Sequence, residues 1–200
     1  MITLYHAPRS RSARFIFLLE ELGAPYQIHQ VNLRRGDGSG ALDPANPHPH
    51  GKVPAIMDDG VLVFESAAIA LYLTDKFPDP GIGPQIGDPR RGAYLTWLAY
   101  YAGVMEPAWM SLFMKWDVPR GTAGWVKADE VMEFVTATLQ KGPYLLGEQF
   151  SAADILVGTT FAMFLGGPMM PKTELLEAYV KRVTERPAHA RAKAKENGHG

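Results

Sequence analysis

The chain begins with MITLYHAPRSRSARFIFLLEELGAPYQIHQVNL, residues 1–33, in which two kinds of pattern alternate. Residues 1–7 and 26–33 are rich in β-branched and aromatic side chains, which is typical of strands. Between them, residues 12–23 carry apolar side chains at helical spacing and end on glycine, a common helix stop. A strand, a helix and a strand in this order predict two parallel strands joined by a right-handed crossover.

The next segments extend this pattern into a domain. Residues 53–64, VPAIMDDGVLVF, predict a hairpin of two short strands with its turn at Asp58, Asp59 and Gly60. Residues 65–77 return to helical spacing. A β-α-β unit followed by β-β-α predicts an α/β domain over residues 1–78.

The second half of the chain has a different character. Residues 79–88 are dense in proline and glycine and predict a linker. Residues 89–200 have a helical pattern almost throughout, so we expect an all-α domain there. Its first helix should kink at Pro107, whose ring crowds the carbonyl four residues earlier. Ser151 with Asp154 three residues on resembles a capping box and predicts the start of an interior helix.

Composition excludes several classes of function. The chain has 200 residues and a formal net charge of −1, with 46% hydrophobic and 20% charged residues, which is ordinary for a globular protein. This balance gives no long-range field for nucleic acid or anionic lipid, so we expect neither partner. We see no run of ~18 apolar residues that would span a membrane. We also see no secretory signal, and we therefore expect a cytoplasmic location.

Thiol and metal chemistry from the protein itself are also unexpected. The sequence has no cysteine, and its six histidines show no zinc-type spacing. His48 and His50, in the segment NPHPHG, are compatible with a metal clip. Two histidines among prolines more often mark an exposed loop, which is the interpretation we prefer. We expect no metal.

Three short motifs resemble the cytosolic glutathione S-transferases. They are G-K-V-P at residues 51–54, E-S at residues 65–66, and F-S-A-A-D-I at residues 150–155. The match extends over essentially the whole chain in the right order. The resemblance implies a thioredoxin-like domain that binds glutathione as a co-substrate, followed by an all-helical domain with a pocket for a small electrophile. It also implies a homodimer.

Within that family the chain looks most like the serine-type classes, which are theta-, delta- and zeta-like. Ser10 lies four residues before Arg14, the offset at which those classes carry their catalytic hydroxyl. A hydroxyl that donates to sulfur stabilises the thiolate, the nucleophilic form of a thiol whose free pKa is ~8.5. Ser12 is a candidate for the same ligand or for the cap of the helix. Arg11 is a further candidate to bind the anionic peptide.

The remaining glutathione contacts are also implied by the resemblance. Val53 and Pro54 match the family's cis-proline turn, which presents the Val53 backbone to the cysteinyl unit as if to an added strand. Lys52 suits the glycyl carboxylate. Ser66, with the start of its helix, suits the γ-glutamyl carboxylate, and Glu65 suits the ammonium of the same unit.

The resemblance implies transfer of glutathione to a small apolar electrophile. Two alternatives use the same scaffold. One is a glutathione-dependent reductase, peroxidase or dehalogenase, with the same first site and different second chemistry. The other is a regulator or assembly partner that has the fold but no catalytic activity.

Overall fold

The computed structural model describes residues 1–167 and 170–198. Its sheet begins with β1 (Ile2–His6) and β2 (Tyr26–Gln30), which run parallel. Helix α1 (Ala13–Leu22) connects them and is buried on nearly all sides, with every residue from Arg14 to Leu19 buried. The predicted strand–helix–strand unit is therefore confirmed.

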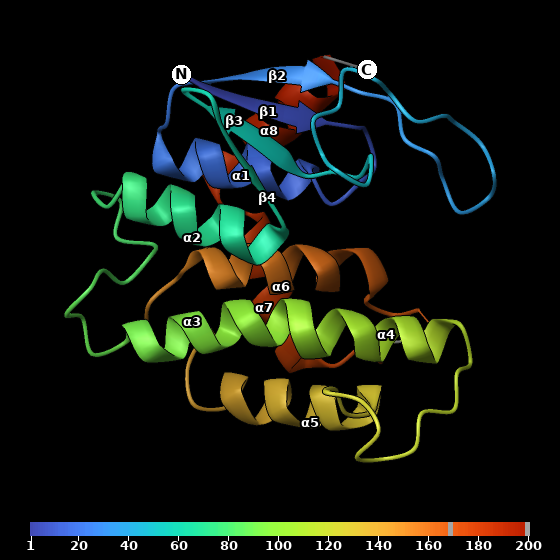
Figure 1. The fold of residues 1–200 in the computed structure, drawn as a ribbon. Helices are drawn as coiled ribbons and strands as arrows, with labels where there is room; N and C mark the ends of the chain where they lie inside the picture. The colour runs from blue at the N-terminus through green and yellow to red at the C-terminus, as the bar shows by residue number, and fades with distance from the viewer. Residues whose placement is uncertain (168–169, 199–200) are drawn as a thin grey trace. The chain divides into compact units, whose positions relative to one another are not determined.

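The hairpin completes a four-stranded mixed sheet. Strands β3 (Ala55–Asp58) and β4 (Val61–Phe64) are antiparallel, and the strand order is β2-β1-β3-β4. Asp59 and Gly60 both have positive φ, at 47° and 86°, as a two-residue hairpin turn requires. Helix α2 (Ser66–Lys76) follows, and α1 and α2 lie on the same face of the sheet (Figure 1).

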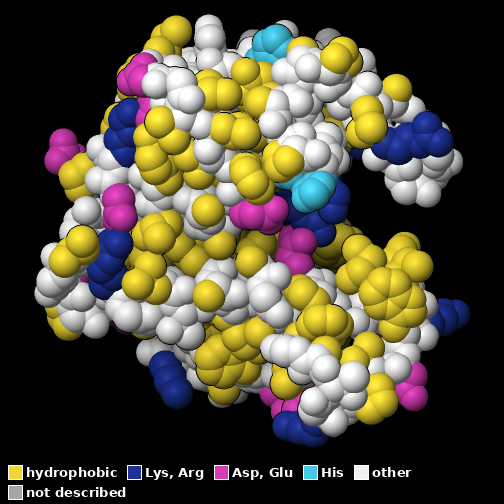
Figure 2. All heavy atoms as spheres, in the orientation of Figure 1, with side chains coloured by type: hydrophobic (Ala, Val, Ile, Leu, Met, Phe, Trp, Pro, Cys, Tyr) yellow, Lys and Arg dark blue, Asp and Glu magenta, His cyan; other side chains and the backbone are white. Residues whose placement is uncertain are grey.

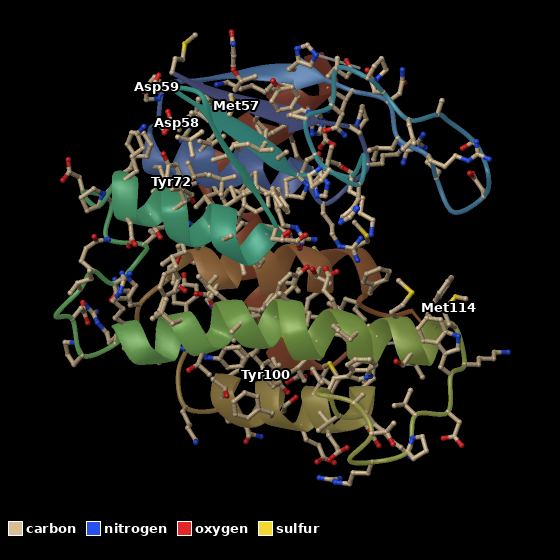
Figure 3. The ribbon with its side chains drawn as sticks, viewed as in Figure 1. Met57, Asp58, Asp59, Tyr72, Tyr100 and Met114 are labelled. Carbon is tan, nitrogen blue, oxygen red and sulfur yellow. The ribbon has the colours of Figure 1, made fainter. Side chains whose placement is uncertain are left out.

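A buried carboxylate joins β3 to α2. Asp58 is 2% exposed, and its Oδ2 atom accepts a hydrogen bond from the Tyr72 hydroxyl at 2.6 Å and pairs with the Lys76 ammonium. Figure 3 shows Asp58 on its strand and Tyr72 on the neighbouring helix. The Lys76 and Tyr72 donors hold the pKa of Asp58 below its ordinary value.

This contact predicts a pH dependence. Because the folded pKa of Asp58 is lowered, its contribution to stability is present above the ordinary carboxyl range and is lost as pH falls through the folded pKa. Asp58→Asn should lower the free energy of unfolding by ~1.5–3 kcal/mol at pH 7 and by less in acid. Urea unfolding at pH 7 and at pH 3 measures both values. An equal loss at the two pH values would contradict the assignment.

The last helix returns to the sheet-containing part of the chain. The chain divides into two compact units, the first comprising residues 1–80 and the segment from Pro187 onward, the second residues 81–186. Helix α8 (Pro187–Gly198) packs on α1, where Arg191 Nε donates to Glu20 Oε2 at 2.9 Å. His189 also meets the edge of the Phe17 ring, with 5.1 Å between centroids. This placement brings Glu196 of α8 to the turn that follows β1.

The second unit is helical. It contains α3 (Arg91–Tyr100), the π-helical turn η1 (Tyr101–Met105), α4 (Glu106–Phe113), α5 (Ala128–Leu139), α6 (Ala152–Phe164) and α7 (Glu174–Thr184). The π turn ends two residues before Pro107, close to where we expected a distortion. A proline has no N–H and crowds the preceding turn, and a π turn is one of the forms that such a distortion takes.

The predicted capping box opens α6, and its carboxylate is fully buried. Asp154 Oδ2 accepts from the N–H and the hydroxyl of Ser151, both at 2.9 Å. Its Oδ1 accepts from the Leu145 N–H at 2.9 Å and from the Tyr179 hydroxyl at 3.1 Å. Burial raises the pKa of Asp154 to about 6, although these donors act in the opposite direction. Asp154 therefore connects α6, α7 and the loop before α6.

Within residues 1–167 and 170–198, we find no helix with the length and apolar character needed to cross a lipid bilayer.

Candidate functional site

The register of the sheet gathers the predicted site residues at one end. Tyr5 of β1 lies opposite Ala55 of β3, and Ala55 lies opposite Phe64 of β4. The turn after β1, the segment before β3 and the segment after β4 therefore all leave the sheet at the same end. Ala7 of the first segment packs with Val53 of the second in one buried cluster.

Ser10 lies in the turn between β1 and α1 and is half-buried. Its hydroxyl donates to the Ala7 carbonyl at 2.7 Å and lies 2.7 Å from the Ser12 hydroxyl. The Ser12 N–H donates to Ser10 Oγ at 3.2 Å. The turn therefore holds Ser10 close to the first residues of α1.

Ser12 precedes α1, but its side chain faces the sheet. It is fully buried, its hydroxyl lies 2.8 Å from Nδ1 of His6, and it accepts from the Ala7 N–H at 3.2 Å. Of the described residues, none in the first turn of α1 donates to this hydroxyl. The alternative that the Ser12 side chain caps α1 is therefore wrong, because its hydroxyl contacts His6 and Ala7 instead.

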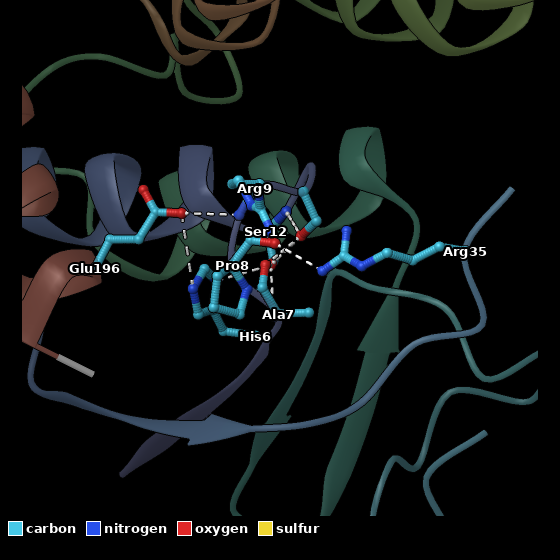
Figure 4. A network of polar contacts seen from close by, with 8 residues as sticks. His6, Ala7, Pro8, Arg9, Ser12, Arg35 and Glu196 are labelled. Carbon is cyan, nitrogen blue, oxygen red and sulfur yellow. Dashed lines mark hydrogen bonds and ion pairs between the residues drawn. The ribbon is translucent and has the colours of Figure 1, made fainter. Parts of the chain in front are cut away.

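Contacts from two distant segments hold the same turn (Figure 4). The Pro8 carbonyl accepts from Arg35 Nη2 at 3.0 Å, and the Arg9 N–H donates to Glu196 Oε1 of α8 at 3.3 Å. Arg9 has a φ of 55°, a conformation uncommon outside glycine. Glu196 Oε1 also lies 3.9 Å from Nε2 of His6. Arg11, in contrast, is exposed at the surface of the turn.

The segment before β3 contains the expected cis peptide bond. The bond between Val53 and Pro54 is cis, as predicted. Val53 is buried at 9% exposure, whereas the Lys52 side chain is exposed. The Lys52 carbonyl accepts from Nδ2 of Asn46 at 3.0 Å, which fixes the backbone next to Val53. An exposed lysine beside a fixed backbone segment can bind a carboxylate.

The loop of residues 46–51 packs beside this segment, and one of its histidines is not exposed. His48 is buried at 6% exposure and not exposed as expected, and its ring lies 5.0 Å from that of Phe64. Asn46 Oδ1 accepts from the His48 N–H at 3.1 Å, and burial lowers the pKa of the His48 imidazole. No group of three potential metal ligands occurs among the residues that the structure describes. The asparagine before a proline in NPHPHG is the signal that would have indicated an ordered turn.

The segment after β4 presents the start of a helix. Glu65 precedes α2, is exposed and has a φ of 70°. Ser66 is the first residue of α2 and is half-buried. The first N–H groups of a helix have no partner within it and favour an anion, so this end of α2 suits a carboxylate.

The helical unit contains a separate hollow of ≈ 1450 Å³, and all of its lining residues belong to residues 108–176. Large apolar side chains are exposed near the end of α4, where Figure 2 shows hydrophobic side chains gathered. Phe113 is 67% exposed and Met114 48%. Tyr101 and Trp109 of the same helical run are buried and belong to the core.

Comparison with known proteins gives consistent matches over both units. Residues 4–81 match the family model described as the glutathione S-transferase N-terminal domain, and residues 101–187 match that of the C-terminal domain. Glutathione S-transferase 3 of Schizosaccharomyces pombe is 32% identical over 77% of this chain and 70% of its own length. The disulfide-bond oxidoreductase YfcG of Escherichia coli is 30% identical over 78% of this chain and 76% of its own.

A solved structure has the same architecture. A sphingomonad glutathione S-transferase complexed with glutathione is 27% identical, with a TM-score of 0.74 over 98% of each chain. The mixed four-stranded sheet, the helical unit and the two family models therefore agree. This chain belongs to the glutathione S-transferase family.

Proposed function

We propose that this protein is a glutathione transferase of the serine type, which ionises bound glutathione at Ser10 and adds it to a small apolar electrophile. The observation that carries the proposal is the sheet register, which gathers the turn of Ser10, the segment of Val53 and the start of α2 at one end of the sheet. Glutathione has three parts that need three kinds of contact, and these segments offer them.

The peptide would lie along the segment before β3. The backbone N–H and C=O of Val53 would pair with the cysteinyl unit in the manner of an added strand. Lys52, which is exposed, would bind the glycyl carboxylate. At the other end, Ser66 and the first N–H groups of α2 would bind the γ-glutamyl carboxylate, and Glu65 would bind its ammonium.

The thiol would be ionised at the turn after β1. Ser10 is half-buried, and its hydroxyl donates a hydrogen bond to the Ala7 carbonyl. Because the side chain is partly exposed, the hydroxyl can rotate and donate instead to a sulfur bound at the surface. A hydrogen bond to a charged acceptor is stronger than one to a neutral acceptor, which favours the thiolate over the thiol. The positive end of α1 acts in the same direction. Arg11, exposed on this turn, would add positive charge for the anionic peptide.

The family resemblance also suggests where the electrophile makes contact and how the protein assembles. Exposed Phe113 and Met114 are candidates for apolar contacts with the electrophile, because methionine and aromatic side chains adapt to ligands of different shape. We also propose a homodimer, as the resemblance implies.

A second candidate activity is disulfide reduction. The similarity to the disulfide-bond oxidoreductase YfcG favours it, and it would use the same glutathione site. A scaffold without catalysis is the third possibility, and it predicts no glutathione binding.

Calorimetric titration with glutathione, followed by activity assays, tests these alternatives. We expect saturable binding that Lys52→Ala weakens about tenfold, equivalent to ~1.4 kcal/mol. The matched control is Lys141→Ala, which removes an exposed lysine from the helical unit. Turnover of an aromatic halide but not of a mixed disulfide supports the transferase, and the reverse supports the oxidoreductase. Absence of binding would overturn both.

A further inference from the structure

The three shortest contacts around Ser10 and Ser12 can all be hydrogen bonds in only one arrangement of protons. Ser10 Oγ lies 2.7 Å from the Ala7 carbonyl oxygen and 2.7 Å from Ser12 Oγ, and Ser12 Oγ lies 2.8 Å from Nδ1 of His6. Each hydroxyl has one proton, and a carbonyl oxygen can only accept. Ser10 must therefore donate to Ala7.

The donors of the other two contacts follow by elimination. Because the Ser10 proton is used, Ser12 donates across the 2.7 Å contact between the two hydroxyls and not to the Ala7 carbonyl, which lies farther away at 3.4 Å. The Ser12 proton is then used as well, so Nδ1 of His6 must carry a proton and donate to Ser12. Ser12 accepts a second bond from the Ala7 N–H at 3.2 Å, which fills its acceptor capacity. The result is a chain of donors that runs from His6 through Ser12 to Ser10.

We propose that His6 and Ser12 are positioning residues for the thiolate, acting through Ser10; this inference rests on the proposed function. Because Ser12 donates to Ser10 Oγ, the Ser10 proton is directed away from Ser12. In the absence of glutathione, the Ser10 hydroxyl donates to the Ala7 carbonyl. When glutathione is bound, it would donate to the glutathione sulfur instead. A thiolate competes well for this proton, because a charged acceptor forms the stronger hydrogen bond.

The chain also strengthens the last bond. A hydroxyl that accepts a hydrogen bond becomes a better donor, so each donor upstream polarises Ser10 further. His6 and Ser12 are both 0% exposed, which keeps water from competing for the two inner bonds. Neither residue needs to contact glutathione for this effect. A purely structural role would leave the ionisation of the thiol unchanged.

Two residues from distant segments of the chain fix the backbone of the turn that carries Ser10. Glu196 of α8 accepts from the Arg9 N–H, and Arg35 donates to the Pro8 carbonyl. Both bonds fix the backbone just before Ser10 and keep its hydroxyl within reach of Ser12. The last helix of the chain therefore contributes to the geometry of the first turn.

The test compares two variants of similar shape, His6→Asn and His6→Leu. The amide nitrogen of asparagine can take the position of Nδ1 and donate to Ser12, whereas leucine cannot donate. With glutathione saturating, the pKa of the bound thiol follows from thiolate absorbance against pH. We expect His6→Leu to raise this pKa by roughly half a unit to one unit, and His6→Asn to restore most of the shift. Equal values for the two variants would overturn the proposal.

Two further variants keep the test decisive if His6→Leu does not fold. Ser12→Ala should raise the pKa of the bound thiol by a similar amount. In a Ser10→Ala background, Ser12→Ala should have no further effect, because the chain ends at Ser10. A full effect in that background would show that Ser12 acts without Ser10 and would contradict the proposal. If the unaltered protein binds glutathione without forming thiolate, the proposed function itself fails, and the donor chain with it.

Discussion

Ser10→Ala is expected to raise the pKa of the bound glutathione thiol by about one to two units, toward its free value of ~8.5. The reason is the loss of one hydrogen bond to a charged acceptor, which contributes ~1.5–3 kcal/mol. The return should be incomplete, since the N-terminal end of α1 still favours the anion. Transfer of glutathione to an electrophile at neutral pH should fall at least tenfold, because less of the thiol is ionised.

Binding and rescue distinguish this effect from damage to the fold. Affinity for glutathione should change little, because Lys52, Val53 and Ser66 hold the peptide in the proposed complex. Ser10→Thr keeps a hydroxyl at the same position and should retain much of the ionisation that alanine loses. If the thiol pKa is the same in both variants, the hydroxyl is not the donor and the serine-type assignment is wrong.

Asp154→Ala should lower the free energy of unfolding by about 3–5 kcal/mol. The carboxylate accepts four hydrogen bonds, so alanine leaves the Leu145 and Ser151 N–H groups and two hydroxyls without their acceptor inside the protein. Each buried donor left without a partner costs about 1–3 kcal/mol, partly recovered by local relaxation. From the sequence, the capping box alone predicts only ~0.5–2 kcal/mol.

The matched variants are Ser151→Ala and Asp154→Asn, compared by urea unfolding at pH 7. Ser151→Ala removes one donor and leaves the carboxylate in place, so it should cost no more than an ordinary cap. Asparagine keeps one acceptor oxygen and should give an intermediate loss. A cost for Asp154→Ala no larger than that for Ser151→Ala would mean that the carboxylate acts only as a cap.

Local pattern predicted the elements well. The strands of the first unit, the hairpin turn and the start of α6 each have a short-range signal: alternation, a turn-forming Asp-Gly pair, or a capping residue. The cis bond at Val53–Pro54 was predicted from the resemblance, because most X–Pro bonds are trans and sequence alone does not distinguish them. The irregularity before Pro107 was located, but its π-helical form was not.

Long-range packing was not predictable in the same way. Nothing local in residues 187–198 indicates that α8 packs on α1, since the contact depends on how Arg191 and Glu20 meet in three dimensions. The orientation of Ser12 toward His6 was missed for the same reason. A serine before a helix has two possible sets of partners, and only the position of β1 decides between them. The burial of His48 likewise depends on contact with Phe64 from another strand.

The central claim is that this protein binds glutathione as a thiolate at physiological pH. Ultraviolet difference absorbance, recorded while the protein is titrated into glutathione near pH 7, tests it most directly. We predict a new thiolate band that grows to saturation with bound glutathione and disappears as pH is lowered through the shifted pKa of the thiol. Saturable binding without such a band would contradict the account.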